Sequence, residues 1–268
     1  MSDGQPDLGI NVAHPARMYD YFLGGKDSYD ADRDAAEKAL REFPEVRLTA
    51  RTNREFMRHA TRYLAGQGIR QYLDIGTGIP TEPNLHQVAQ ELAAESRVVY
   101  VDNDPIVLAH ARALLVGTPE GRTAYIQADA SDPRSILGKL EDTLDLAQPV
   151  AVSLMATLHF VPGDVYEHVR AFMAPLASGS YLAMSHVTTD FDNGPDDPRG
   201  MARLLQVYKD RGIPVRPRSR AEVARFFDDL ELVEPGVEVI HRWRNEGIAH
   251  PKSHDKAVSL YGAVGRKP

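Results

Sequence analysis

The sequence contains no cysteine among its 268 residues. This absence excludes disulfide bonds, catalysis by a thiolate and zinc sites built on cysteine ligands. An excess of positive charge is also missing, because the formal net charge is −7. Surfaces that bind nucleic acid need basic residues to neutralise phosphates, so we expect no nucleic acid among the partners of this protein.

Long hydrophobic runs are absent too. The sequence has no run of about 18 apolar residues, the length that a membrane-spanning helix requires, and we expect no contact with a membrane. Its first residues, MSDGQPDLGI, lack the basic segment and following apolar segment of a secretory signal. We therefore expect a cytoplasmic location. The sequence gives no indication of the oligomeric state.

Strand-like and helix-like segments alternate through the middle of the chain, and this alternation predicts an α/β fold. The expected strands cover residues 71–75, 97–102, 123–127, 150–155 and 180–186. Segments with helical signals separate them, which favours a doubly wound, mainly parallel sheet with helices on both faces. The later segments ELVEPGVEVI and AVSLYGAVGR have no long helix between them, so we expect an antiparallel pair and seven strands in all.

The residues before this alternation are expected to form helices. Phe56, Met57 and Ala60 recur at roughly helical spacing in the segment that precedes the first strand. We therefore divide the chain into an N-terminal helical segment, residues 1–69, and an α/β domain, residues 70–268.

A glycine turn follows the first expected strand, in the segment YLDIGTGIPT. Asp74, Gly76 and Gly78 form the pattern D-x-G-x-G directly after apolar residues. Glycine has no Cβ, so such a turn lets the backbone approach a ligand closely. The helix that follows presents free N–H groups and the positive end of its dipole to an anion. The pattern predicts a ligand-binding turn.

Two further acids follow the next two expected strands. Asp102 ends the apolar segment VVYVD, and Asp129 follows TAYIQA. Ligands of open α/β sheets bind at the carboxyl ends of the strands, and acids at these ends are typical of folds that bind nucleosides. Each acid has an alternative role as a helix cap or a turn residue.

These motifs resemble the class I S-adenosylmethionine (SAM)-dependent methyltransferases. LDIGTG matches the first motif of that family, the end of VVYVD the second, and ADA at residues 128–130 the third. More narrowly, ARMYDYFLGGKDSYDADR, DIGTGIPT, YVDNDPIVLAHARALL and PGVEVIHRWR resemble an uncharacterised group of actinobacterial methyltransferases. The resemblance covers nearly the whole chain. It implies a Rossmann-like sheet of seven strands, SAM as cofactor and S-adenosylhomocysteine (SAH) as its product.

The resemblance also implies roles at the first two motifs. Gly76 and Gly78 would lie against the methionine part of SAM, and Asp74 would order the turn or meet the amino group through water. Asp102 would accept hydrogen bonds from the ribose hydroxyls, and Asn103 would contact the adenine.

The later motifs receive roles in the same way. Asp129 would bind the adenine amino group, and the amide of Ala130 would contact a ring nitrogen. The segment from Met155 to Phe160 should line the cleft at the strand ends, with Met155 against the cofactor. His159 is the candidate catalytic base, because the ordinary pKa of histidine lies near neutral pH. The alternative is a structural histidine that donates to a backbone carbonyl, and His186 has the same two interpretations.

Pro80 is a departure from the family pattern, because many methyltransferases have a third glycine there and proline supplies no N–H. The methionine carboxylate would then depend on Thr81 or on the N-terminal segment. That segment contains Tyr21 and Lys26, and we expect it to form a lid whose aromatic and basic residues contact the sulfonium and the carboxylate. The alternative is an amphipathic helix whose aromatic residues only pack on the core.

We predict a SAM-dependent methyltransferase that transfers a methyl group to a small-molecule acceptor by in-line displacement. Such chemistry can depend mostly on positioning, so no catalytic pair is required. One alternative is a protein that binds SAM or SAH without catalysis.

The other alternative is an NAD(P)-dependent oxidoreductase, because GTGIPT with Asp102 loosely matches a dinucleotide fingerprint. Against it stand Thr81 in place of the last glycine, the third acid Asp129 and the lack of a Tyr-x-x-x-Lys pair after the fourth strand. The segment HPKSH, residues 250–254, has two histidines four residues apart, but it reads as a loop with no carboxylate arranged with them on a helix face, and we expect no metal.

Overall fold

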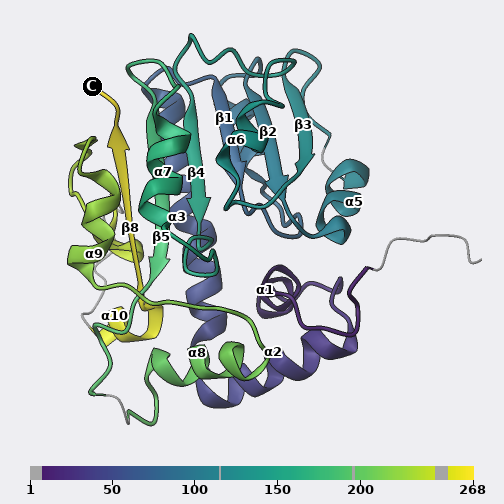
Figure 1. Ribbon diagram of the computed structural model, residues 1–268, viewed down its shortest axis with the longest axis vertical. Helices are drawn as coiled ribbons and strands as arrows, with labels where there is room; N and C mark the ends of the chain where they lie inside the picture. Colours follow the sequence, from purple (N-terminus) through teal and green to yellow (C-terminus); the bar gives the residue numbers. More distant parts are fainter. Residues whose placement is uncertain (1–7, 115, 195–196, 245–252) are drawn as a thin grey trace, which may run out of the picture.

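The structure is a computed structural model that describes residues 8–114, 116–194, 197–244 and 253–268. At its centre is one sheet with the strand order β3-β2-β1-β4-β5-β8-β6, and the short strand β7 also pairs with β8 (Figure 1). The strands are β1 (Gln71–Ile75), β2 (Arg97–Asp102), β3 (Arg122–Gln127), β4 (Ala151–Met155), β5 (Tyr181–Val187), β6 (Glu231–Leu232), β7 (Glu238–Val239) and β8 (Leu260–Arg266).

The first five strands run parallel, and their bounds agree with the sequence prediction to within one residue. In the middle of the sheet, Leu73 of β1 lies opposite Val99 of β2 on one side and Val152 of β4 on the other. All three side chains are fully buried. Continuous apolar runs of this kind are typical of strands that are covered on both faces. The positions of these strands could therefore be predicted from the sequence.

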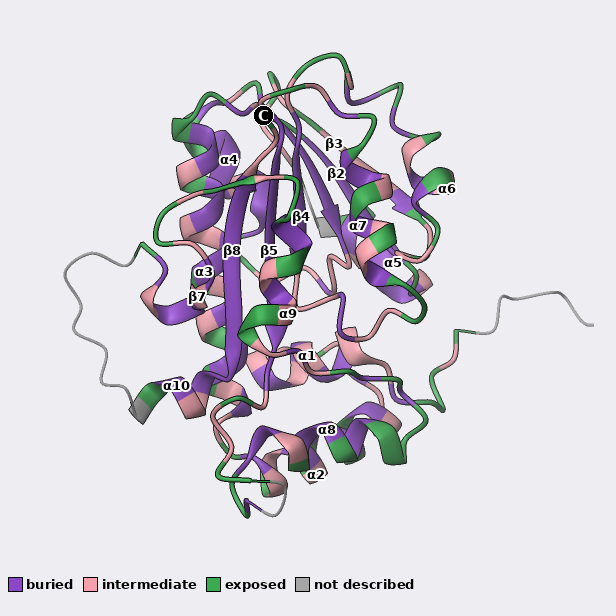
Figure 2. Ribbon diagram, turned by 60° about the vertical axis from the view of Figure 1, so that its left-hand side comes forward, coloured by how far each residue is buried: buried purple, intermediate pink, exposed green. Residues whose placement is uncertain are grey.

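Helices cover both faces of the sheet and confirm the doubly wound α/β fold. Helices α3 and α4 pack together on one face, and α6 and α7 lie on the other (Figure 2). Helices α1, α2 and α8 lie beyond the carboxyl ends of the parallel strands (Figure 1). The helices are α1 (Pro15–Leu23), α2 (Asp30–Glu42), α3 (Val46–Gly66), α4 (Leu85–Leu92), α5 (Pro105–Leu114), α6 (Pro133–Leu137), α7 (Val165–Met173), α8 (Met201–Asp210), α9 (Arg220–Ala224) and α10 (Ser253–Val258), with short 3₁₀ helices at Arg225–Phe227 and Ile240–Arg242.

The C-terminal edge of the sheet differs from the prediction in one detail. The two last segments pair antiparallel, as expected, and β8 is also antiparallel to β5, but ELVEPGVEVI forms two short strands instead of one. β6 and β7 pair with different parts of β8, because a turn closed by the amide of Gly236 and the carbonyl of Val233 (2.8 Å) separates them. The two strands share the seventh position of the sheet.

A buried charge cluster fixes the N-terminal helices over the sheet edge. Arg17 of α1 places Nε 3.1 Å from Oδ2 of Asp104, which follows β2, and Nη1 3.5 Å from Oδ2 of Asp32 in α2. All three residues are buried. Asp32 also accepts hydrogen bonds from the backbone amides of His14 (2.8 Å) and Tyr29 (2.9 Å). One desolvated guanidinium therefore joins α1, α2 and the loop after β2.

We predict that Arg17→Ala lowers the free energy of unfolding by about 3–5 kcal/mol, because it leaves two buried carboxylates without their cation. The control is Lys38→Ala. Lys38 joins α2 to Asp210 of α8 through an exposed ion pair of 3.2 Å, and its loss should cost less than about 1 kcal/mol. Chemical denaturation of both variants provides the measurement. Equal losses in the two variants would contradict this account of the cluster.

Candidate functional site

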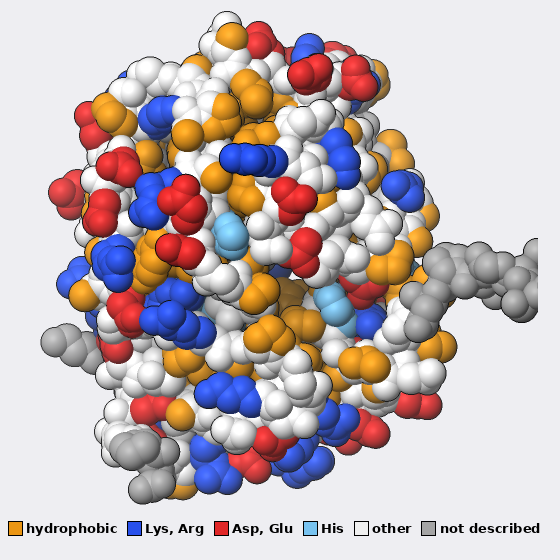
Figure 3. All heavy atoms as spheres, in the orientation of Figure 1, with side chains coloured by type: hydrophobic (Ala, Val, Ile, Leu, Met, Phe, Trp, Pro, Cys, Tyr) orange, Lys and Arg blue, Asp and Glu red, His pale blue; other side chains and the backbone are white. Residues whose placement is uncertain are grey.

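A cavity of about 460 Å³ lies at the carboxyl edge of the parallel strands, lined also by residues of α1, α3 and α8. Figure 3 shows hydrophobic side chains around a hollow in the middle of this face. Nine of the residues predicted from the sequence line the cavity: Asp74, Gly76, Gly78, Asp102, Asn103, Asp129, Ala130, Met155 and His159. Four different strand ends thus bring the predicted residues to one place.

Asp102 organises the glycine turn. Its Oδ2 accepts a hydrogen bond from the amide of Gly78 at 2.9 Å, and its Oδ1 accepts one from the amide of Asp104 at 3.0 Å. Burial raises the pKa of Asp102 above its ordinary value, and the two amide bonds oppose that rise. The carboxylate at the end of β2 is therefore held against the turn after β1.

The two glycines of the turn serve different purposes. Both have positive φ, 72° at Gly76 and 69° at Gly78, which other residues rarely adopt. A Cβ on Gly76 would also lie 2.4 Å from the side chain of Thr157, so this glycine is needed for packing. A Cβ on Gly78 would meet only the Cβ of Ala16, at 4.0 Å. The backbone of Gly78 is the open part of the turn that a ligand can approach.

The pKa values of Asp74 and Asp129 are shifted in opposite directions. Burial raises the pKa of Asp74 to about 6, although Thr77 donates a hydrogen bond to its Oδ2 at 3.3 Å. Burial also raises the pKa of Asp129, but hydrogen bonds from Ser131 and from Asn103 Nδ2 (3.0 Å) outweigh it, and the net pKa lies below the ordinary value. At neutral pH the strand ends therefore carry negative charge, which favours a cationic ligand.

Arg54 of α3 is a site residue that the sequence analysis missed. Its Nη2 donates to the backbone carbonyls of Thr81 and Pro83, directly after the glycine turn. Among the described residues, it is the one lysine or arginine that lines the cavity. Arg54 lies three residues before Met57, which also lines the cavity, so helical spacing was the signal that could have found it.

Three predicted residues lie outside the cavity. The amide of Thr81 donates to Oδ1 of Asn84 at 3.1 Å and so helps to start α4. The hydroxyl of Tyr21 donates to Glu37 at 3.2 Å, and Lys26 is exposed. We therefore do not include these three residues in the site that is proposed below.

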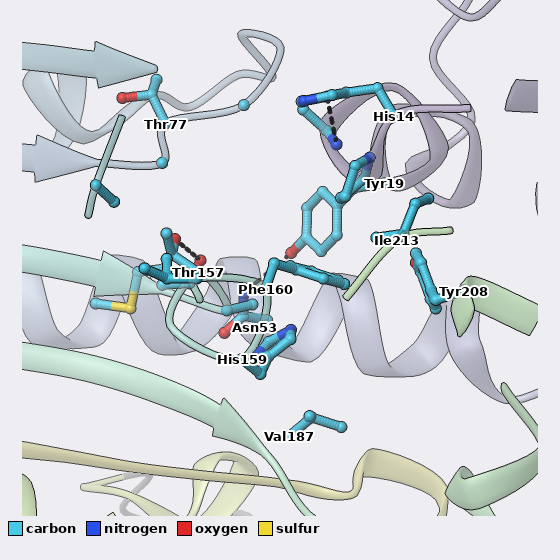
Figure 4. A pocket seen from close by; sticks show the side chains of 18 of the residues that line it. His14, Tyr19, Asn53, Thr77, Thr157, His159, Phe160, Val187, Tyr208 and Ile213 are labelled. Carbon is cyan, nitrogen blue, oxygen red and sulfur yellow. Dashed lines mark hydrogen bonds between the residues drawn. The ribbon is translucent and has the colours of Figure 1, made fainter. Parts of the chain in front are cut away.

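The far end of the same cavity has no charged side chains in its lining. It extends from the strand ends near Thr77 and Thr157 toward Tyr208 and Ile213 (Figure 4). We call this part the apolar chamber. Its lining consists of Tyr19, Phe22, Val46, Thr49, Asn53, Met57, His159, Phe160, Val187, Met201, Leu204, Leu205, Tyr208, Ile213 and Leu260. Helix α8 and the loop after it thus form part of the site, a question that the sequence left open.

His159 is buried in the wall of the apolar chamber. In the described part of the chain, Nδ1 of His159 has no hydrogen-bond partner. Its ring centroid lies 4.3 Å from that of Phe160 and 5.2 Å from that of His186. Burial holds the pKa of His159 well below its ordinary value, and the neighbouring His186 and Arg218 lower it further. His159 is therefore neutral at physiological pH.

His186, by contrast, is a structural histidine. It is fully buried, and its Nδ1 donates to the carbonyl of Val187 at 2.9 Å. Its Nε2 accepts from Nη1 of the buried Arg218 at 2.8 Å. Burial lowers the pKa of His186 to about 3. Both ring nitrogens are used within the protein, so His186 has no free group for a ligand.

The described ranges hold no metal site. No group of histidine and acidic side chains in them could hold a metal ion, and His250 of the HPKSH segment lies outside those ranges. None of the described helices is long and apolar enough to cross a membrane.

The residues present fit an adenosyl ligand with a positive charge. Asp102 and Asp129 offer carboxylate oxygens at the ends of β2 and β3, Gly78 leaves its backbone open, and the acids favour a cation. Together with the doubly wound sheet and its antiparallel β8, this site defines a class I SAM-dependent methyltransferase. The chain belongs to the S-adenosyl methyltransferase family, whose model matches residues 1–268. SAM is thus the cofactor, and the family favours the methyltransferase prediction over the oxidoreductase alternative.

Solved structures agree with this assignment. The chain is 49% identical to a DUF574 family protein from Streptomyces avermitilis, with 98% of this chain and 100% of that chain covered and a TM-score of 0.92. It is 36% identical to a candidate methyltransferase from Thermobifida fusca, with 100% and 99% covered and a TM-score of 0.87. The predicted actinobacterial group is thereby confirmed. A comparison with functionally curated proteins finds none that matches.

A more distant structure shows the fold alone. It is the plantazolicin methyltransferase BpumL in complex with SAH, which is 10% identical to this chain. The similarity covers 94% of this chain and 95% of that chain, with a TM-score of 0.50.

We predict that Asp74→Asn stabilises the ligand-free protein by about 3 kcal/mol at pH 7.5, because a pKa raised from 3.8 to about 6 opposes the charged form by that amount. A raised pKa means that protonated Asp74 favours the fold below pH 3.8, and that this contribution is lost as the pH rises through about 6. The gain should therefore vanish near pH 4 in denaturation experiments. The exposed Asp142→Asn is the control and should change little at either pH. A loss of stability in Asp74→Asn at pH 7.5 would contradict a raised pKa of Asp74.

Proposed function

We propose that this methyltransferase transfers the methyl group to a small molecule that binds in the apolar chamber. The observation that supports this proposal is the continuity of one cavity, from Gly78 and Asp102 at the strand ends to Phe160 and Tyr208 at its far end. A volume of about 460 Å³ is in the range of sites for small ligands. A macromolecular acceptor would need an open surface for its reactive group instead.

We propose that the strand ends hold the cofactor. Asp102 would bind the ribose hydroxyls, and Asp129, Asn103 and Ala130 would surround the adenine. Met155 would lie against the bound cofactor.

At the methionine end, the open backbone of Gly78 would lie against the chain of the cofactor. Asp74 would attract the ammonium group, and Arg54 would pair with the carboxylate, since a guanidinium binds carboxylates well. Arg54 replaces Thr81, Tyr21 and Lys26 in this role because it is the basic residue that faces the cavity.

When bound, SAM supplies a methyl group on a positively charged sulfur, and the carbon–sulfur bond breaks as the nucleophile of the acceptor bonds the methyl carbon in line. The chain must hold the acceptor in that line, which the packed walls of the apolar chamber can do. His159 is the proposed acceptor of the proton that the nucleophile loses. A proton on a heteroatom becomes strongly acidic as the heteroatom gains a methyl group, so a weakly basic imidazole is sufficient.

The N-terminal helices are proposed to act as a cover that excludes water. Ala13, His14 and Ala16 at the start of α1 line the cavity, and Tyr19 and Phe22 continue this lining along the helix. The charge cluster around Arg17 holds them in this position. This arrangement supports the lid that was predicted for the N-terminal segment, although the residues that line the cavity differ from Tyr21 and Lys26.

We predict that Asp102→Asn weakens the binding of SAM and SAH by roughly 100-fold, because hydrogen bonds to a charged group contribute about 1.5–3 kcal/mol each. Isothermal titration calorimetry with SAM, SAH and NAD is the measurement, and Asp142→Asn is the control. NAD should not bind. Binding of NAD with no binding of SAH would contradict the proposed site.

We further predict that the affinity for SAM falls by about tenfold from pH 7.5 to pH 5, because Asp74 is protonated as the pH drops through its pKa of about 6. The negative charge that attracts the ammonium group is then lost. In Asp74→Asn this decrease should be clearly smaller. The measurement is a titration of both proteins with SAM at each pH. Equal decreases in affinity in the two proteins would exclude Asp74 as the cause.

A further inference from the structure

The charged side chains of the cavity are confined to one end. Asp74, Asp102, Asp129 and Arg54 line the strand ends and the glycine turn, whereas the apolar chamber has no aspartate, glutamate, lysine or arginine among its described lining residues. A charged group that enters the chamber would lose its hydration without gaining a counter-charge. Such burial is costly unless the charge is paired.

Most polar groups of the apolar chamber are already used within the protein. The hydroxyl of Tyr19 donates to the carbonyl of Ala50 at 2.9 Å and accepts from Nδ2 of Asn53 at 3.2 Å. Oδ1 of Asn53 in turn accepts from the hydroxyl of Ser185 at 2.6 Å. The hydroxyl of Thr49 donates to the carbonyl of Ala257 at 3.0 Å. These groups form part of the chamber wall, but their hydrogen bonds within the protein leave them little capacity to bind a ligand.

His159 is different. Among the side chains that line the described cavity, its Nδ1 is the one buried nitrogen or oxygen without a hydrogen-bond partner. An unpaired buried nitrogen of this kind destabilises the folded protein unless a ligand or a water molecule forms a hydrogen bond with it. The second polar group that remains is the hydroxyl of Tyr208, whose ring lies 5.2 Å from that of Phe160. Burial raises the pKa of Tyr208 and lowers that of His159, so both are uncharged at neutral pH.

The remaining walls of the apolar chamber consist of aromatic and aliphatic side chains. Phe160 and Tyr208 face the chamber, and Figure 4 shows Tyr19, Phe160 and Tyr208 around the same space. Leu204, Leu205 and Ile213 complete the side formed by α8 and the loop that follows it. Aromatic walls of this kind favour ring systems, because rings pack on them in offset-stacked or edge-to-face arrangements.

We propose that the methyl acceptor is an uncharged ring compound with one proton-bearing heteroatom, a phenol or a similar hydroxyl- or N–H-bearing aromatic, that faces His159. Its ring body packs between Tyr19, Phe160 and Tyr208. Acceptors that are charged in their bound part, such as carboxylates and phosphates, are excluded. This inference rests on the proposed function, because it assumes that the apolar chamber holds the acceptor.

The experiment uses the full-length protein saturated with SAH and three probes of one shape. The probes are 2-naphthol, which has the hydroxyl, naphthalene, which lacks it, and 2-naphthoate, which is an anion. Binding is measured directly, so no turnover is needed. We expect 2-naphthol to bind about fivefold to tenfold more tightly than naphthalene, because it gains one hydrogen bond. We expect 2-naphthoate to bind at least roughly 100-fold more weakly than 2-naphthol.

Variants locate the probe. In His159→Phe, the difference between 2-naphthol and naphthalene should disappear, while Tyr208→Phe should retain at least part of it. The SAH titration of each variant reports whether the cofactor site is intact, and thermal unfolding reports whether the variant is folded. A variant that loses SAH binding is replaced by His159→Leu, which removes the same polar group with a smaller side chain.

The outcomes separate the two proposals. If SAH does not bind to the wild-type protein, the proposed function itself fails. If SAH binds but 2-naphthoate binds as tightly as 2-naphthol, the proposed acceptor class is wrong while the proposed function stands. The acceptor class is likewise wrong if none of the three probes binds to the SAH-loaded protein, or if His159→Phe leaves the preference for 2-naphthol unchanged.

Discussion

Two carboxylates, one at the end of β2 and one just after it, hold the site together. Asp102 binds the amide of Gly78 and thereby fixes the glycine turn after β1 to the end of the neighbouring strand. Asp104, two residues later, binds the guanidinium of Arg17 and thereby fixes the N-terminal helices over the same edge. Its amide in turn donates to Asp102, so the two connections share one short segment of backbone. Hydrogen bonds and a buried ion pair thus join the turn, the strand end and the cover into a single unit.

The cavity offers two environments to its ligands. The strand ends concentrate carboxylates, which favour a cationic cofactor at the cost of stability in the ligand-free protein, as the raised pKa of Asp74 indicates. Beyond them, α1, α3 and α8 supply aromatic and aliphatic side chains together with a neutral His159. The methyl group on the positively charged sulfur would therefore meet the acceptor in surroundings that contain no other charged group. Water would find few partners there, which favours transfer to the acceptor over hydrolysis.

The sequence predicted the parts of this arrangement that depend on local pattern. The alternation of strand-like segments with helical signals defined β1 to β5, and the residues at the ends of β1 to β3 were placed in the cavity as expected. ELVEPGVEVI was predicted as one strand-like segment, whereas the turn at Gly236 divides it into two short strands. Arg54 was missed and the contribution of α8 was left open, because both depend on tertiary contacts of helices that lie outside the strand-end motifs. Tyr21 and Lys26 belong to the segment that covers the site. Helical geometry in α1 directs Tyr19 and Phe22, not Tyr21, toward the cavity, and Lys26 is exposed in the loop after α1.

The most direct test of the central claim is a crystal structure of the protein with SAH. We predict that the adenosine lies at the ends of β2 and β3 against Asp102 and Asp129, and that the sulfur faces the apolar chamber near Phe160. The N-terminal helices should remain in place through Arg17. SAH bound elsewhere, or bound with its sulfur directed away from the chamber, would contradict the claim that one cavity holds both the cofactor and the acceptor.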